Sequence, residues 1–113
     1  MDCVFCKISN GTIPSKKLFE DSKFFIIQDI APKAKIHLLA IPKNHFAGFF
    51  DMTDNDKNIV GHILATIGKL EKTLGLISGY RIIINQGKDG GQTVFHLHMH
   101  ILAGQELPFN SYN

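Results

Sequence analysis

The chain has 113 residues, of which 44% are hydrophobic and 19% are charged, and its formal net charge is +2. This composition is ordinary for a globular protein, and we expect a single domain over residues 1–113. The charge is too small to indicate a nucleic-acid partner, and no apolar run approaches the roughly 18 residues that a membrane span needs. Because no signal-peptide pattern is visible, the sequence predicts a cytoplasmic protein without a membrane partner.

Two cysteines, Cys3 and Cys6, stand near the start of the chain with two residues between them. A disulfide is not expected in a reducing compartment. Two thiolates at this spacing supply half of a tetrahedral zinc site, although the spacing alone fits two incidental thiols equally well. A short helical turn from Val4 should end at Asn10-Gly11.

The next segments are typical of strands. Residues 17–20 and 24–28 are β-prone runs on either side of Asp21-Ser22, which predicts a hairpin. Residues 36–41 are almost continuously apolar and predict a central strand that is buried on both faces. His37 is the polar exception in that strand, and it is either a functional residue or a polar residue at a strand edge.

A helix is predicted from Thr53, its N-cap, to Gly75, with acidic residues in the first turn and one broad apolar stripe. It should cover one face of the sheet, with His62 beside the stripe and facing solvent. Residues 80–84 predict a further strand. Together the elements indicate an α+β layer of antiparallel strands with one long and one short helix.

The stretch from Asn85 to Ala103 joins a glycine-rich loop to an apolar strand with three histidines. His96, His98 and His100 alternate with Leu, Met and Ile, so a single strand would place the three imidazoles on one face. Glycines permit positive φ and let backbone N–H groups close around an anion. The loop glycines are Gly87, Gly90 and Gly91. This combination predicts phosphate chemistry.

The run His96-Leu-His-Met-His-Ile-Leu resembles the His-x-His-x-His-x-x motif of the histidine-triad superfamily. The segments Asp29-Ile-Ala-Pro, His37-Leu-Leu-Ala-Ile-Pro-Lys and Gly90-Gly-Gln-Thr are similar to its Hint-like branch, and the N-terminal Cys-x-x-Cys to bacterial members of that branch. The resemblance implies an α+β HIT-like fold with an antiparallel sheet of about five strands. It also implies that two subunits join their sheets in a homodimer.

The same resemblance implies an enzyme that hydrolyses or transfers at the α-phosphate of a purine nucleotide, typically a nucleoside phosphoramidate or an acyl-adenylate. His98 falls on the nucleophile, which forms a nucleotidyl-histidine intermediate, and His100 on the histidine that contacts the phosphate oxygens. His37 aligns with a residue on the leaving-group side. The other phosphate-binding positions are Asn85, Gly91 and Thr93.

Further residues match the nucleoside and zinc positions of the family. Asp29 falls on the residue that accepts the ribose hydroxyls. The positions that sandwich the base are Val4, Phe5, Ile8, Ile27 and Ile30, although these apolar residues could equally be ordinary core. The zinc ligands of bacterial relatives correspond to Cys3, Cys6, His45 and His96. Such a closed Cys2His2 set is structural, and no catalytic cofactor is expected.

Three alternatives stay open at this stage. The Fhit-like branch, which cleaves dinucleoside polyphosphates, shares the Gly-Gln-Thr stretch, while Asn85 and Phe95 favour the Hint-like branch. A metal-dependent hydrolase could use the three triad histidines as ligands. A nucleotide-binding dimer with vestigial activity is the third. Phe109 stands where eukaryotic relatives carry a tryptophan, which leaves the leaving-group preference open.

Overall fold

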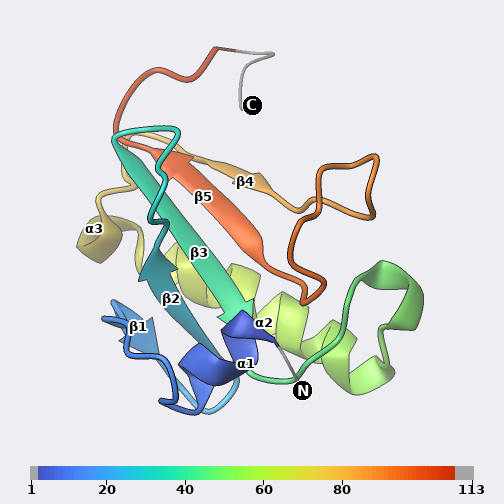
Figure 1. Ribbon diagram of the computed structural model, residues 1–113. Coiled ribbons are helices and arrows are strands. Elements are labelled where there is room, and N and C mark those ends of the chain that lie inside the picture. Colours follow the sequence, from blue (N-terminus) through green and yellow to red (C-terminus); the bar gives the residue numbers. More distant parts are fainter. Residues whose placement is uncertain (1–2, 109–113) are drawn as a thin grey trace.

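In a computed structural model, residues 3–108 form a five-stranded antiparallel sheet with a helix on each face (Figure 1). The strand order is β1-β2-β3-β5-β4. The elements are α1 (Val4–Ser9), β1 (Phe19–Glu20), β2 (Phe24–Gln28), β3 (Ile36–Pro42), the 3-10 turn η1 (Phe49–Asp51), α2 (Asp54–Lys69), α3 (Glu71–Leu74), β4 (Arg81–Ile83) and β5 (Met99–Ala103). The predicted α+β fold is thereby confirmed. None of the helices in this part of the chain is both long and apolar enough to cross a bilayer.

The predicted hairpin is present, with a shorter first strand. The Asp21 Oδ1 atom accepts hydrogen bonds from the backbone N–H groups of Lys23 (2.7 Å) and Phe24 (3.0 Å), which closes the turn. β1 then pairs with β2 over only Phe19 and Glu20. β3 is the central strand, as predicted, and every residue after Ile36 is buried.

The long helix begins where the sequence predicted. Thr53 Oγ1 accepts the N–H of Asp56 at 3.1 Å, and an Asp56 carboxylate oxygen accepts the N–H of Thr53 at 3.1 Å, which forms a capping box. The predicted continuous helix to Gly75 is wrong, because α2 ends at Lys69 and α3 follows. The N–H of Leu70 is shared between the carbonyls of Thr66 and Ile67, which tightens the last turn.

Two apolar clusters fill the two faces of the sheet. Figure 1 shows α2 behind the sheet and α1 in front of it. The core under α2 comprises Phe24, Ile26, Leu38, Ala40, Ile59, Ile63, Ile67, Leu76, Met99, Ile101 and Ala103. The core under α1 comprises Cys3, Phe5, Ile8, Phe25, Ile27, Leu39 and Ile41. The alternation of β3 and β5 therefore leaves His37 and His100 on the α1 face.

The prediction that one strand carries all three triad histidines is wrong. β5 begins at Met99, so only His100 lies in the strand, opposite Leu39. The residues before Met99 do not pair with a strand of the sheet. The N–H of Leu97 donates instead to the carbonyl of Phe46, in the connection after β3, at 2.8 Å. The prediction that the residues alternating with the histidines are core is confirmed for Leu97 and Met99, which are fully buried. His96 and His98 thus point into different environments.

Candidate active site and candidate metal centre

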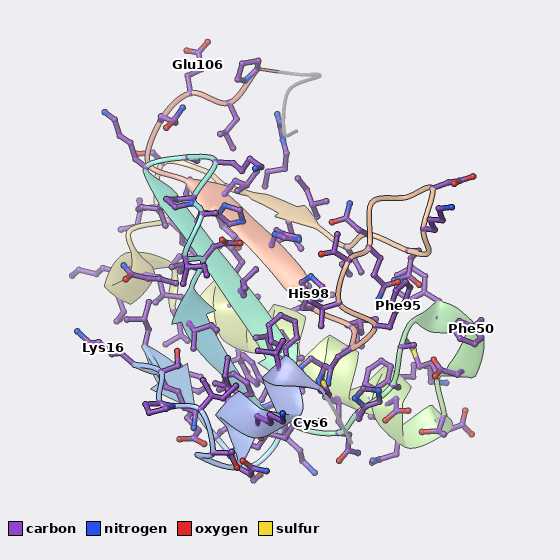
Figure 2. The ribbon with its side chains drawn as sticks, viewed as in Figure 1. Cys6, Lys16, Phe50, Phe95, His98 and Glu106 are labelled. Atoms are coloured by element: carbon purple, nitrogen blue, oxygen red, sulfur yellow. The ribbon has the colours of Figure 1, made fainter. Side chains whose placement is uncertain are left out.

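A cavity of about 420 Å³ opens on the α1 face between β3, β5 and the glycine loop. Figure 2 shows His98 just before the start of β5, well inside the molecule, whereas Phe95 and Phe50 lie at its margin. The cavity is lined by Lys33, His37, Ile83, Asn85, Asp89, Gly90, Gly91, Thr93, His98, His100 and Leu102. The structure thus brings together the predicted catalytic and phosphate-binding side chains from four segments of the chain.

His98 is held in one tautomer by the backbone. Its Nδ1 atom lies 2.8 Å from the carbonyl oxygen of His96, and because a carbonyl only accepts, Nδ1 carries the proton. The lone pair is therefore on Nε2. Burial lowers the pKa of His98, so the ring is neutral near pH 7. The edge of the Phe5 ring packs against it, with ring centroids 5.0 Å apart. A buried, neutral imidazole with a free Nε2 is a competent nucleophile.

His37 and His100 form a directed chain on the cavity wall. The backbone N–H of Lys33 donates to His37 Nδ1 at 3.0 Å, so the proton of the neutral His37 ring is on Nε2. That Nε2 lies 3.0 Å from His100 Nδ1 and 3.4 Å from a carboxylate oxygen of Asp29. His100 therefore accepts at Nδ1 and keeps its own proton on Nε2. Burial lowers the pKa of His37 and lowers that of His100 to about 4.

The ligand atoms of Asp29, His37 and His100 all lie within 4.8 Å of one another, which is close enough to consider a metal ion. The hydrogen-bond pattern argues against one. Because His37 Nδ1 already accepts from Lys33, a metal on Nε2 would need a fully deprotonated ring or the loss of that bond. The arrangement instead suits a hydrogen bond from His37 to His100 and a second one from His100 Nε2–H into the cavity.

The glycine loop is closed by its own hydrogen bonds. Gly87 and Gly91 have φ of +72° and +84°, as predicted, whereas a Cβ at Gly90 would lie 2.3 Å from the carbonyl oxygen of Gln86. The N–H of Gly91 donates to the carbonyl of Lys88 at 3.0 Å. A phosphate would therefore bind the Gly91 N–H only by displacing that carbonyl, and binding of an anion by the backbone of this loop stays a prediction.

The loop also carries side chains that can donate hydrogen bonds into the cavity. One hydrogen of the Asn85 amide donates to the carbonyl of Gly90 at 2.8 Å, and the amide carries a second. Asn85 and Thr93 both line the cavity. So do two charged residues that the sequence analysis did not single out, Lys33 and Asp89. Charged residues in polar loops give no signal in the sequence until the fold places them beside a cavity.

Gln92 is a further residue that the sequence analysis missed. Its side chain is buried and bonds to three segments of backbone, with Oε1 accepting from Gly87 N–H at 2.9 Å. Its Nε2 donates to the carbonyls of Ala47 at 2.7 Å and Val94 at 3.2 Å. The only available signal was an amide between a glycine pair and a β-branched run, which is equally typical of an exposed loop.

The predicted nucleoside residues separate into two groups. Phe5, Ile8 and Ile27 are buried in the core under α1, whereas the side chains of Val4 and Ile30 are 41% and 101% exposed. Asp29 caps a turn through the N–H of Ala31 at 2.8 Å and also faces His37. An assignment of these residues to a base and ribose pocket stays a prediction. Phe109, considered for leaving-group preference, lies outside the described residues.

The four predicted metal ligands converge beside His98. Cys3 Sγ lies 3.4 Å from His96 Nδ1, Cys6 Sγ lies 3.4 Å from His45 Nδ1, and the two Nδ1 atoms are 3.1 Å apart. Tetrahedral zinc with ordinary bond lengths requires separations of roughly 3.3 to 3.8 Å. All four ligand atoms lie within 4.8 Å of one another. The two distances between sulfur and nitrogen fall in this range and the two Nδ1 atoms lie slightly closer, so the set is near the size of a closed tetrahedral centre.

The protonation pattern of this cluster also fits a cation. His96 donates from Nε2 to the carbonyl of Pro42 at 2.7 Å, which leaves the lone pair of Nδ1 directed at the cysteines. Burial lowers the pKa of His96 to about 4, so its ring is neutral. Burial and the neighbouring Cys3 raise the pKa of the Cys6 thiol to about 11, and a bound cation would reverse that shift. A structural zinc ion therefore fits the residues present.

The comparison with known families decides the classification. Residues 10–107 match the model of the HIT domain. The chain belongs to the HIT-domain family. It is 41% identical over 106 residues to an uncharacterised HIT-like protein of Synechococcus elongatus, covering 94% of this chain and 93% of the relative. These matches confirm the histidine-triad superfamily that the sequence indicated.

Solved structures share the fold of this HIT protein. A histidine triad protein from Clostridium difficile is 47% identical, with a TM-score of 0.90, covering all of this chain (100%) and 97% of that one. A HIT family hydrolase from Legionella pneumophila is 41% identical, with a TM-score of 0.90 and coverages of 96% and 98%. A zinc-bound histidine triad protein from Mycobacterium smegmatis is 34% identical, with a TM-score of 0.82 and coverages of 99% and 81%.

Proposed function

We propose that this HIT protein is a Hint-like hydrolase that cleaves purine nucleoside phosphoramidates or acyl-adenylates at the α-phosphate. The observation that carries the proposal is the arrangement of the two cavity histidines. His98 has its Nδ1 proton bound to the carbonyl of His96, which leaves Nε2 as the nucleophile. His100 accepts at Nδ1 from His37, which leaves its Nε2–H as a donor to phosphate oxygens. The hydrolase from Legionella pneumophila supports the reaction class.

In the first step, His98 Nε2 attacks the α-phosphorus, and the bond from phosphorus to the leaving nitrogen or oxygen breaks. The leaving group takes up a proton and departs, and the nucleotide remains on His98 Nε2. The His98 ring then carries a positive charge, which the carbonyl of His96 stabilises through Nδ1–H. The proton that the leaving group takes up comes from solvent, because His37 and His100 are already neutral rings and the loss of a further proton would leave an imidazolate.

In the second step, water attacks the same phosphorus, the bond from phosphorus to Nε2 breaks, and the proton that the water loses passes to solvent. The nucleoside monophosphate leaves, and His98 returns to the neutral ring with a free Nε2. Negative charge develops on the phosphate oxygens in both steps, where His100 Nε2–H, the Asn85 amide and the Thr93 hydroxyl are the available donors. Gly91 would add its N–H only after releasing the carbonyl of Lys88.

The nucleoside would lie between α1 and the loop after β2. Asp29 faces the cavity histidines from that loop, and an aspartate carboxylate can accept both ribose hydroxyls. Val4 and Ile30 present exposed apolar side chains that could cover a purine, whereas Phe5, Ile8 and Ile27 would form the floor below it. The preference for a purine comes from the family resemblance.

The metal centre has a structural role in this proposal. Cys3, Cys6, His45 and His96 would hold zinc with all four positions filled, so the ion would take no part in the reaction. It would secure α1 to the segment that precedes β5. The zinc-bound relative from Mycobacterium smegmatis supports this assignment. We also propose that the chain belongs to the Hint-like branch with an N-terminal Cys-x-x-Cys pair. The protein would be located in the cytoplasm.

We also propose that two subunits form a homodimer by joining their sheets. β4 lies at one edge of the sheet, and its three residues, Arg81–Ile83, are all half-buried in the single chain. An edge strand of this kind can continue a sheet into a second copy. Size-exclusion chromatography with light scattering would give twice the 12.6 kDa chain mass if the proposal holds.

The central experiment measures AMP release from adenosine 5′-phosphoramidate with a chelator in the assay. The variant is His98→Ala, and the matched control is His62→Ala, which removes a histidine from the exposed surface of α2, where it pairs with Asp21. Labelled substrate is quenched during turnover to recover adenylylated protein. Turnover that His62→Ala retains and His98→Ala abolishes, with label on the protein, supports the mechanism.

Two outcomes would contradict the proposal. Turnover of His98→Ala near that of the unaltered protein would remove the nucleotidyl-histidine step. A protein that binds AMP but shows no turnover above background would instead be a nucleotide-binding protein, or an enzyme for dinucleoside polyphosphates. The three-histidine metal hydrolase is already disfavoured, because His96 faces the cysteines while His100 faces His37.

A further inference from the structure

Gln92 spans the base of the glycine loop with its side chain. Oε1 accepts the N–H of Gly87, where the loop begins, and Nε2 donates to the carbonyl of Val94, just after the loop ends. The backbone N–H of Gln92 also donates to the carbonyl of Gly87 at 3.0 Å. These bonds tie Gly87 to Gln92 and Gln92 to Val94, and so fix the stretch of backbone that contains Gly91 and Thr93.

The same side chain attaches this stretch to a second segment. The other hydrogen of Nε2 donates to the carbonyl of Ala47, two residues after the metal ligand His45. The N–H of Leu97 donates to the neighbouring Phe46 carbonyl, so the two segments run side by side, as Figure 1 shows. Gln92 is therefore the contact between the glycine loop and the segment of Phe46 and Ala47 that follows His45.

We propose that Gln92 is the positioning residue of the phosphate-binding loop, holding Thr93 and Asn85 where they meet the phosphate of a bound nucleotide. This inference rests on the proposed function for the identity of the ligand. Gln92 itself is not among the residues that line the cavity, and both of its donor hydrogens and Oε1 are bonded to backbone. It acts through the loop.

The chemistry of the amide explains why another side chain would not serve. Gln92 itself is only 6% exposed, and its partners Ala47 and Val94 are half-buried, so their carbonyls would lose a donor at positions with limited access to water, whereas Gly87 is exposed. A methionine would fill the same volume and satisfy none of them. The loop would then have several alternative conformations, and the phosphate would bind only the fraction in the correct one.

The experiment compares AMP with adenosine by calorimetric titration, because the two ligands differ only in the phosphate. The variant is Gln92→Met. The matched control is Gln86→Met, since Gln86 bonds the same second segment through Phe49 N–H at 2.8 Å but does not span the loop. We expect Gln92→Met to bind AMP about tenfold or more weakly and adenosine within about twofold of the unaltered protein. For Gln86→Met we expect both affinities to change by less than about threefold.

Amide exchange gives a readout that does not depend on ligand. In the unaltered protein the Gly87 amide should exchange at least about tenfold more slowly than those of Lys88 and Asp89, and Gln92→Met should abolish that protection. Equal losses of AMP and adenosine affinity would show a general structural role and overturn the inference. So would unchanged AMP affinity, or an unprotected Gly87 amide in the unaltered protein, which decides the matter if Gln92→Met does not fold.

The inference and the proposed function can fail separately. If the unaltered protein binds AMP but does not hydrolyse the phosphoramidate, the hydrolase proposal fails while the titrations still test Gln92. If the hydrolase proposal holds and Gln92→Met binds AMP normally, only the inference about Gln92 fails.

Discussion

The Nδ1–H of His98 donates to the backbone carbonyl of His96, two residues earlier, at 2.8 Å. The side chain of His96 itself donates to the carbonyl of Pro42 and directs Nδ1 toward Cys3. One residue thus connects the proposed nucleophile to the proposed metal centre. The geometry of the nucleophile therefore depends on how firmly the cysteines and histidines hold the segment before β5.

Removal of zinc should destabilise the protein. We expect one zinc ion per chain by mass spectrometry of metals, and a thermal midpoint that falls by roughly 10 to 20 °C after chelation, because a ligand that binds only the folded state is lost. The double variant Cys3→Ser, Cys6→Ser should start from the lower midpoint and not respond to chelator. An unaltered protein whose midpoint is the same with and without chelator would contradict the assignment.

Acid should destabilise the fold partly through His100. Its pKa is about 4 in the folded protein and 6.5 as the ordinary value, so between these values the unfolded chain binds more protons. This contribution is fully present above pH 6.5 and is lost as the pH falls toward 4. The unfolding free energy should fall by on the order of 2 kcal/mol more in the unaltered protein than in His100→Asn. Urea unfolding at several pH values measures the difference, and parallel curves would refute it.

Loss of His37 should slow the reaction without removing the nucleophile. His37→Phe deletes the donor to His100 Nδ1, so the His100 ring is free to change tautomer. We expect kcat to fall by about a hundredfold while labelled adenylyl protein still forms slowly. The surface variant His62→Phe should keep full activity. An unchanged kcat in His37→Phe would show that His100 keeps its tautomer without this bond.

Two adjacent residues of α2 should differ sharply in their effect on stability. Ile63 is fully buried in the core under α2, whereas the side chain of Leu64 is 44% exposed. Ile63→Ala should lower the unfolding free energy by about 3 to 4 kcal/mol, because it opens a cavity, and Leu64→Ala by less than about 1 kcal/mol. Urea denaturation provides the values. Similar losses from both variants would mean that Leu64 is covered, as it would be in a dimer that uses this face.

Local chemistry made much of the fold predictable. Thr53 caps α2 because a threonine oxygen three residues before Asp56 satisfies its N–H wherever the helix packs. The run of residues 36–41 is apolar except for His37, so it could be buried only in a strand that is covered on both faces. The break at Leu70 was not predictable, because the apolar stripe continues through it and only the packing of α3 reveals it.

The candidate site was predictable in its residue types and not in its arrangement. Alternation placed the three triad histidines on one face, but the hydrogen bond between Leu97 and Phe46 keeps that segment out of the strand. The tautomer of His96, the meeting of Cys3 with His96 and the bond from Gln92 to Ala47 depend on groups far away in the sequence. The sequence by itself determined which side chains could carry the chemistry, because side-chain type sets acidity and ligand preference. Only the tertiary structure decided which atom of each imidazole is free, because that follows from the carbonyl or N–H that the fold brings to its other nitrogen.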